Sequence, residues 1–191
     1  MSLARRAHPL RAFCILIVGL CSAPVCAHAA EIQVGLGPSA YASTWRGDYG
    51  GGGTLKLGMR FARVIGFDFQ GWESLASVDT RLLTGLSLGV RGSLPLERVS
   101  PFVRAFVIHQ HEEGLVSAQA TPLGVIAGIG AGIRHRAGAG FSLGADVPVQ
   151  RVGKRTQINF FGQGNATWLA NELGPAWYFG LDFGVSMDFS L

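Results

Sequence analysis

The chain has 191 residues, of which 48% are hydrophobic and 15% are charged, and it contains 28 glycines. This composition excludes a disordered chain, because disordered segments combine low hydrophobicity with high net charge. The formal net charge is +4, but Arg5, Arg6 and Arg11 fall in the first 29 residues, which contain no Asp or Glu. The remainder holds 13 basic and 12 acidic residues. No basic run is left to bind nucleic-acid phosphates, so nucleic acid is excluded as a partner.

Residues 1–29 have the features of a secretory signal peptide. A basic segment is followed by nine apolar residues at 12–20, too few for the roughly 20 that a membrane-spanning helix needs. The small residues of Ala27-His28-Ala29 then offer a cleavage site. We predict a leader at 1–29 and an exported chain at 30–191, with a retained membrane anchor as the alternative. All cysteines lie in the leader, so the exported chain has no disulfide or thiol chemistry.

From residue 31 onward, apolar residues recur at every second position, which is typical of β-strands. The clearest case is residues 177–191, where the odd positions are apolar and the even positions, apart from Tyr178, are small or acidic. Seven further segments with similar patterns complete a prediction of eight strands. They lie at 32–37, 54–61, 65–70, 82–91, 102–109, 124–134 and 141–150.

The predicted connections alternate between short turns and longer polar loops. The short ones lie at 62–64, 93–100 and 136–140, and the longer ones at 39–52, 73–80, 110–122 and 151–174, although 73–80 is no longer than 93–100. Transmembrane barrels have this asymmetry between their two ends. Lipid offers no hydrogen-bond partner to an open sheet edge, so strands in a membrane must close into a barrel. We therefore predict an all-β, eight-stranded antiparallel up-and-down transmembrane barrel.

The charged residues of the strands indicate which face points to the lumen. A basic side chain facing lipid at mid-depth costs roughly 2–4 kcal/mol, so the face rich in Gly, Ser and charges is expected inside. In segment 102–109, placing Arg104 inside also places Phe102, Phe106 and Ile108 there, and we favour that register. The predicted lumenal charge network consists of Lys56, Arg60, Asp68, Arg91, Arg104, Arg134, Asp146, Asp182 and Asp188.

Opposite charges in so narrow a lumen are expected to pair with one another, since unpaired charges away from water are costly. The expected result is a filled, non-conducting interior. The alternative is a narrow charge-lined conduit for ions or small solutes.

The exported chain resembles the small outer-membrane β-barrels of Gram-negative bacteria, of the outer membrane protein A/X transmembrane type. The resemblance rests on Pro-Phe-Val-Arg-Ala at 101–105, Gly-Ile-Gly-Ala-Gly-Ile-Arg at 128–134, Phe-Ser-Leu-Gly-Ala at 141–145 and the terminal strand. It implies a monomer in the outer membrane with both termini in the periplasm. It also implies that the last strand is a signal for the barrel-assembly machinery, although Leu191 replaces the usual terminal Phe. The signal residues would be Phe183, Val185, Met187, Phe189 and Leu191.

His109, His111, Glu112 and Glu113 are the candidate metal ligands. A His-x-His pair on a strand points both rings to one side, as a metal site requires. The segment opens a predicted polar loop, however, and no third ligand follows from the spacing. We predict a solvated loop, with no metal and no cofactor.

An acyl-chain enzyme would need a histidine, a serine and an acid near the outer rim. Ser117 follows His111 and Glu112, but no His-x-Ser pattern lies on a strand, and we do not predict an enzyme. The glycines at 50–53 are not followed by the Lys-Ser/Thr of a phosphate-binding loop and are interpreted as a flexible loop tip. Amphipathic aromatic rings prefer the headgroup level of a membrane. We place there Tyr41, Trp45, Trp72, Trp168, Trp177 and Tyr178.

The predicted loop 151–174 mixes basic and aromatic residues, including Lys154, Arg155, Phe160, Phe161 and Trp168. It could contact lipopolysaccharide phosphates, a partner protein or neither. The hypothesis is an integral outer-membrane protein with a structural or surface-interaction role, whose partners are lipid, lipopolysaccharide and the assembly machinery. The alternatives are a small porin, a lipid A or phospholipid acyl-chain enzyme, and a soluble lipocalin-like binder with its apolar face inward.

Overall fold

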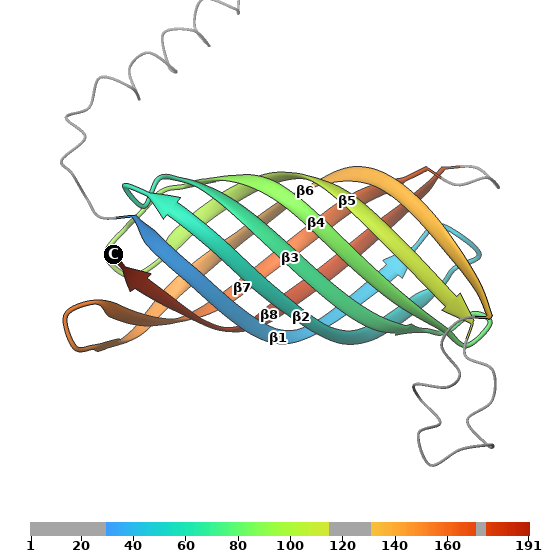
Figure 1. Ribbon diagram of the computed structural model, residues 1–191, viewed down its shortest axis with the longest axis horizontal. Helices are drawn as coiled ribbons and strands as arrows, with labels where there is room; N and C mark the ends of the chain where they lie inside the picture. Colours follow the sequence, from blue (N-terminus) through green and yellow to red (C-terminus); the bar gives the residue numbers. More distant parts are fainter. Residues whose placement is uncertain (1–29, 115–130, 171–174) are drawn as a thin grey trace, which may run out of the picture.

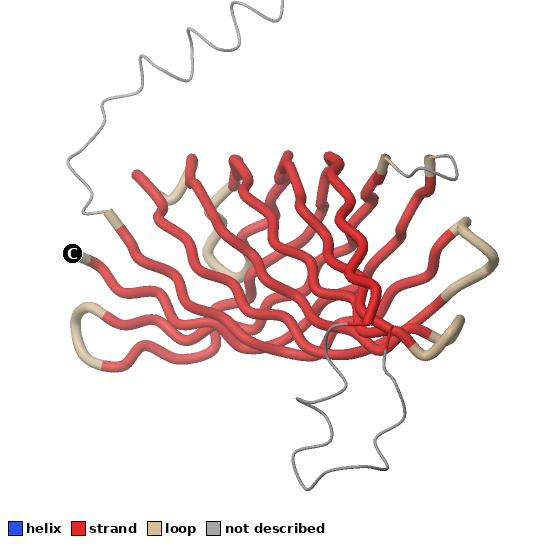
Figure 2. The backbone as a smooth tube through the Cα atoms, turned by 45° about the vertical axis from the view of Figure 1, so that its right-hand side comes forward, coloured by secondary structure: helices blue, strands red, loops and turns tan. Residues whose placement is uncertain are grey.

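The computed structural model describes residues 30–114, 131–170 and 175–191. These residues form only strands and connections (Figure 2), and among them no helix is long and apolar enough to cross a membrane. The predicted leader and Ser117 lie outside the described residues. The strands are β1 (Glu31–Ser43), β2 (Tyr49–Phe61), β3 (Ile65–Ala76), β4 (Arg81–Ser93), β5 (Ser100–Gly114), β6 (Ala131–Val152), β7 (Thr156–Leu169) and β8 (Ala176–Ser190).

Each strand pairs antiparallel with its neighbours in sequence, and β1 pairs with β8 to close the barrel. The closing pairs run from Glu31 opposite Ser190 to Ser43 opposite Tyr178. The strands wind obliquely around the axis, and β1 begins at the end where β8 finishes (Figure 1). We call this the terminal end and the opposite end, which carries the connections 44–48 and 77–80, the loop end. The predicted fold class is confirmed.

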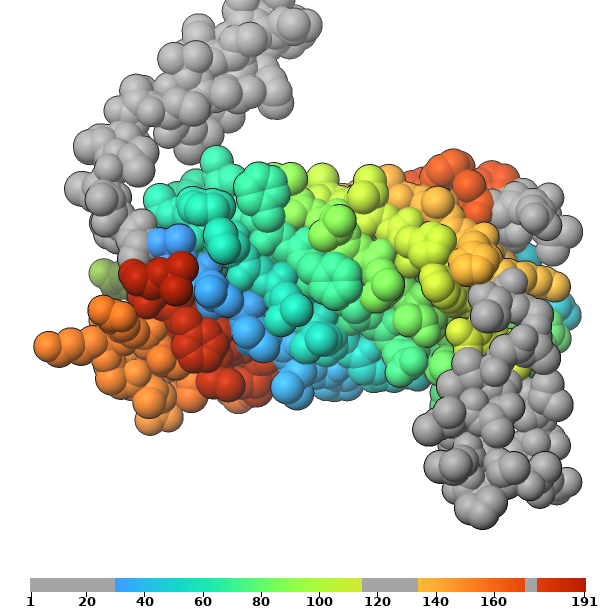
Figure 3. Space-filling view, in the orientation of Figure 1, coloured from blue at the N-terminus to red at the C-terminus, as the bar shows by residue number. Residues whose placement is uncertain are grey.

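The outward side chains of the strands form an apolar belt around the barrel. Leu88, Leu181 and Phe183 expose 63%, 64% and 56% of their surface, and the space-filling view shows a continuous wall of side chains (Figure 3). A soluble protein rarely exposes so large an apolar surface, so the lipocalin-like alternative, which needs this face inward, is wrong. Further members of the belt are Leu36, Leu57, Phe67, Val90, Val107, Phe141, Leu143, Phe160 and Phe179.

The predicted turn at 136–140 is wrong, because β6 runs without interruption through these residues. Gly138 and Gly140 face the interior, where a Cβ would overlap Leu169 and Phe106 respectively. These glycines therefore make room for side chains of neighbouring strands and do not mark a chain reversal. Most of the predicted strand at 124–134 lies outside the described residues.

The predicted loop 151–174 is also wrong, since most of it forms β7. Only residues 153–155, with Gly153 at a φ of 66°, separate β6 from β7, and this turn lies at the terminal end. Lys154 and Arg155 occupy that turn, while Phe160 and Trp168 face outward and Phe161 faces inward.

The other loops predicted to be long are shorter than expected where they are described. Strands β1, β2, β3 and β5 extend into them, so the connections at the loop end shrink to 44–48 and 77–80. The glycines at 50–53 belong to β2 and are not a loop tip. A Cβ at Gly50 would overlap the backbone of Leu75 and the ring of Tyr41, so glycine there permits close approach. The predicted turns at 62–64 and 93–100 are confirmed.

Candidate functional site

The barrel interior holds nearly all of the charged residues predicted to line it. Eight of the nine are buried, and the exception is Arg134, which is exposed at the loop end. Two residues further along β6, Arg136 is buried and occupies the inward position that the sequence analysis gave to Arg134. Among the described residues, six basic and seven acidic side chains are buried. The interior charges are thus almost balanced.

Arg104 points inward, in the register that the sequence analysis favoured. Phe102, Arg104, Phe106 and Ile108 are all buried, while Val107 on the opposite face is 61% exposed. The guanidinium of Arg104 lies 4.5 Å from the ring centroid of Phe106. Aromatic rings are therefore compatible with an inward face that also carries charge, because they pack against the flat guanidinium groups.

At the terminal end, buried charges form a connected group that we call the terminal cluster. Arg60 contacts Glu31, Asp146 and Asp188, and Arg91 pairs with Asp146. Amide side chains complete it: Gln33 donates to Asp188 at 3.0 Å, and Asn159 donates to the same carboxylate at 2.8 Å. These groups come from β1, β2, β4, β6, β7 and β8, so the cluster crosses the whole barrel.

Halfway along the barrel, a central cluster surrounds Asp182. Its Oδ2 accepts hydrogen bonds from Gln70 at 2.7 Å, Gln163 at 2.9 Å and Asn165 at 2.7 Å. Lys56 donates to Gln163 at 2.9 Å, and its ammonium nitrogen lies 4.4 Å from the ring centroid of Phe161. On the other side of the barrel, Arg104 pairs with Asp68 and donates to Ser87 at 2.9 Å.

Arg104 has room only because residue 89 is a glycine. A Cβ at Gly89 would lie 2.6 Å from Nε and 2.9 Å from Cζ of Arg104. Gly89→Ala is therefore expected to displace the guanidinium from Asp68 and to lower the free energy of unfolding by about 1–3 kcal/mol. Urea unfolding of the barrel in lipid vesicles measures the change. Gly162→Ala is the matched control, because its Cβ would meet nothing within 4 Å; equal losses in both variants would contradict the explanation.

At the loop end, a mouth cluster closes the barrel. Asp48 is fully buried and accepts hydrogen bonds from Tyr41, Ser77, the backbone of Val78 and Arg81, at 2.9–3.0 Å. Arg81 also pairs with Glu112, which contacts Arg136 at 2.9 Å. The ring of Trp45 lies over both arginines, with its centroid 4.5 Å from Cζ of Arg81 and 5.4 Å from that of Arg136. The connection 44–48 is thus folded over the mouth.

The predicted aromatic positions divide into two groups. Trp168 and Trp177 face outward and are 40% and 42% exposed, as expected for rings at a membrane interface. The other four do not face the membrane, because they pack in or against the interior core at the loop end. They are Tyr41, Trp45, Trp72 and Tyr178.

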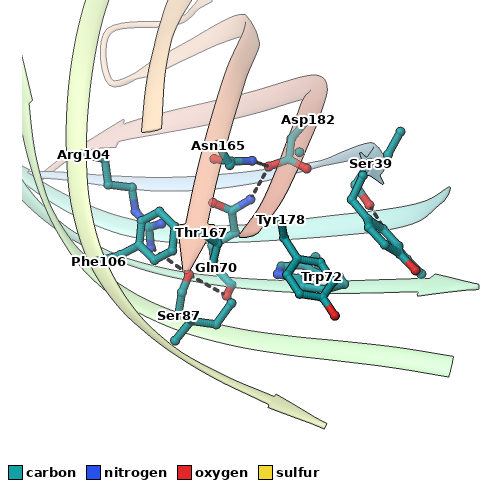
Figure 4. Close-up of a pocket in the computed structure, with 15 residues that line it drawn as sticks. Ser39, Gln70, Trp72, Ser87, Arg104, Phe106, Asn165, Thr167, Tyr178 and Asp182 are labelled. Atoms are coloured by element: carbon teal, nitrogen blue, oxygen red, sulfur yellow. Dashed lines mark hydrogen bonds between the residues drawn. The ribbon is translucent and has the colours of Figure 1, made fainter. Parts of the chain in front are cut away.

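A cavity of about 40 Å³ lies between the central and mouth clusters (Figure 4). Gln70, Asn165 and Asp182 are joined by hydrogen bonds on one side of it, and Tyr41, Trp72 and Phe106 contribute to its wall. One water needs roughly 10–15 Å³ of such space, so the cavity has room for only a few waters. Its lining offers carboxylate, amide and hydroxyl groups for hydrogen bonding.

The candidate metal and enzyme residues lie on opposite faces of β5. His109 and His111 belong to the strand and not to a loop, and both are on its outward face. Glu112 points inward, where its pairs with Arg81 and Arg136 hold it in the mouth cluster. The carboxylate of Glu112 is therefore on the opposite side of the wall from the imidazole of His111. The pair of His111 and Glu112 on which the acyl-chain alternative depended is therefore not assembled.

Sequence reasoning missed five buried charges: Glu31, Asp48, Arg81, Glu112 and Arg136. It placed Asp48, Glu112 and Arg136 in connections, where charged residues are usually solvated, and left Glu31 and Arg81 at the edges of strands. The signal in the sequence was weak, but Arg81 does share the parity of Arg91 along β4, and Arg136 that of Asp146 along β6. Residues an even number of positions apart on a strand share a face, and this was the clue that could have placed Arg81 and Arg136 inside.

Neither protein-family models nor curated proteins give a match to the chain. Solved structures do. Neisserial surface protein A superposes with a TM-score of 0.59 at 10% identity, covering 85% of this chain and 97% of that one. OprG from Pseudomonas aeruginosa gives 0.52 at 10% identity, covering 86% and 98%. Ail, the attachment invasion locus protein of Yersinia pestis, solved with the heparin analogue sucrose octasulfate, gives 0.50 at 14% identity, covering 84% and 99%.

The closed barrel, its apolar belt and its charged interior define a small β-barrel protein of the outer membrane. This is the fold and the location that the sequence analysis predicted. Because the identities are 10–14%, the likeness establishes the fold, and a more specific function has to be argued from this chain's own residues.

Proposed function

We propose that this protein acts through its outer surface, as a structural or surface-interaction protein, and that its lumen does not conduct. The observation that carries the proposal is the sequence of three cross-barrel clusters, one at each end and one in the middle. The terminal and mouth clusters contain several buried ion pairs, and the Arg104–Asp68 pair lies between them beside the hydrogen-bonded Asp182. An ion or solute would have to separate these groups to pass. Breaking a buried pair by removing one partner typically costs about 3–5 kcal/mol, so transient opening along the whole axis is unfavourable.

Planar lipid bilayers provide the test. Protein whose folded state has been verified by heat-modifiable gel mobility is expected to insert without producing steady single-channel currents. Recovery of the protein with floated vesicles controls for insertion. Steady currents whose ion selectivity changes with Arg91→Gln or Asp182→Asn would overturn the proposal and favour the porin alternative.

The expected orientation of the barrel in the membrane determines which of its ends can meet partners outside the cell. With both termini in the periplasm, as the resemblance implies, the loop end faces outward and the turn 153–155 faces the periplasm. Lys154 and Arg155 would then be on the side away from lipopolysaccharide and could not contact its phosphates. Lipopolysaccharide would instead meet the loop end of the barrel wall. Ail is an attachment protein solved with a heparin analogue, and that supports surface interaction as a role this fold can have.

We also propose that the last strand directs assembly. Phe183, Val185, Met187 and Phe189 are exposed on the outward face of β8, and Leu191, directly after the strand, is exposed as well. The assembly machinery could therefore bind these side chains before the barrel closes. Their exposure supports this role. Leu191 stands where the resembling family usually has Phe, but it is also apolar and keeps the alternation intact.

A further inference from the structure

All the histidines that follow residue 29 meet at one place on the barrel. The chain has five histidines, of which His8 and His28 precede residue 29. His109 and His111 are two residues apart on β5 and therefore share its outward face. His135 lies on β6 directly opposite His111 in the strand pairing. The third imidazole that the sequence spacing could not identify is thus supplied by the neighbouring strand.

The three rings converge closely enough to share one ion. One ring nitrogen from each histidine lies within 4.8 Å of the others, and Nδ1 of His135 is 3.4 Å from Nε2 of His109. The ring centroids of His109 and His111, and of His111 and His135, are both 4.6 Å apart. Zinc binds imidazole nitrogens at about 2.0–2.1 Å in a tetrahedron, which places two such nitrogens about 3.3 Å apart. Small ring rotations therefore bring all three into a coordination shell.

The site lies where an ion can reach it. His109 and His135 are exposed and His111 is half-buried. Along β5, His109 is the next outward residue beyond Val107, which pairs with Ala139 of β6, and Ala139 in turn pairs with Trp168 of β7. Because Trp168 is one of the two outward tryptophans, the imidazoles lie just beyond the aromatic positions, on the loop-end side. At that level water and dissolved ions are present.

Glu113 is a carboxylate that could support metal binding by these histidines. Glu113 follows His111 by two residues on β5, and its Oε2 is buried without a hydrogen-bond partner among the described residues. Metal-binding histidines usually donate their second ring N–H to a carboxylate or carbonyl, which fixes the ring orientation. Glu113 shares the outward face of β5 with His111, so its unpaired oxygen is available to orient the His111 ring, although it is not among the ligand atoms that lie within 4.8 Å of one another.

We propose that His109, His111 and His135 form a binding site for one divalent transition-metal ion of the zinc, copper or nickel type. Three neutral imidazoles suit these ions, whereas Mg²⁺ and Ca²⁺ prefer oxygen ligands. Three protein ligands leave one tetrahedral position for water or for a group from outside the chain. The site is on the outside of the wall, so it works independently of whether the lumen conducts.

Isothermal titration calorimetry with ZnCl₂ tests this site at pH 7.5, on protein purified in detergent with a tag that contains no histidine. We expect one Zn²⁺ per chain and no heat with MgCl₂ or CaCl₂. His111→Ala and His135→Ala should each weaken binding at least about tenfold, because each removes a ligand. Lowering the pH should weaken binding, because protons compete with the metal for the imidazole nitrogens and only neutral histidine coordinates a metal.

Arg134→Ala is the matched control, since it changes the residue next to His135 without removing an imidazole and should leave zinc affinity unchanged. Heat-modifiable mobility establishes that every variant is folded. With Cu²⁺, electron paramagnetic resonance should show coupling to nitrogen in the parent protein and loss of part of it in His135→Ala. Absence of zinc binding to the folded parent, or equal affinity in the parent and both histidine variants, would overturn the proposal.

Discussion

Asp146→Ala is expected to lower the free energy of unfolding of the barrel by about 3–5 kcal/mol, because it leaves the buried guanidinium of Arg91 without its carboxylate partner. Oδ2 of Asp146 accepts hydrogen bonds from Arg91, from Arg60 at 3.4 Å and from Gln33 at 3.5 Å. Arg60 keeps its pairs with Glu31 and Asp188 in the variant, so the loss falls on Arg91. Urea unfolding in lipid vesicles, followed by tryptophan fluorescence and gel mobility, measures the loss.

Asp79→Ala provides the control for that substitution. Asp79 pairs with Arg46 at 2.8 Å, a normal ion-pair distance, but both side chains are more than half exposed. Exposed ion pairs contribute less than about 1 kcal/mol, so this variant should unfold almost like the parent. If Asp146→Ala were as mild as Asp79→Ala, the terminal cluster would not stabilise the barrel in the way described.

The second large effect is expected on the opposite face of the wall. Leu88 lies in the middle of β4, points outward and is 63% exposed. Leu88→Arg should cost about 2–4 kcal/mol, because it places a charge in the hydrocarbon part of the membrane. The same urea titration in vesicles measures it.

Leu94→Arg introduces the same residue in the connection between β4 and β5, where Leu94 is 60% exposed. Near the membrane surface the cost falls to about 0–1 kcal/mol. The contrast between the two variants therefore tests depth in the membrane, since side-chain type and exposure are matched. Similar costs at both positions would contradict the placement of the apolar belt.

The sequence patterns predicted most of the barrel because lipid imposes a strict rule on outward residues. In β8 the outward positions, the odd residues from Trp177 to Phe189, are all apolar, and the pattern was clear. In β7 it was not, since the glycines Gly162 and Gly164 occupy outward positions, and Phe161 faces the interior. Glycine can face lipid because it carries no polar side chain. The aromatic ring of Phe161 can face the interior because it packs against the ammonium group of Lys56. Alternation of hydrophobicity is then lost although the strand remains.

The inward glycines of β6 also could not be interpreted from the local sequence. A run such as Ala-Gly-Ala-Gly at 137–140 is typical of a turn when read alone. Its glycines are explained only by Phe106 and Leu169, which come from other strands. The histidine cluster depends on the same information, because His135 meets His111 only through the register of β5 and β6. Contacts between strands that are distant in sequence cannot be derived from the spacing within one segment.

The pairing of β1 with β8 joins the first and last strands that the structure describes. Until β8 has been synthesised and brought into place, the hydrogen-bonding groups of Ile32 to Ser43 have no partner along one edge, and lipid cannot supply one. Insertion and closure therefore have to be coupled. A chain lacking its last fifteen residues should fail to assemble as a whole, because it lacks the strand that pairs with β1.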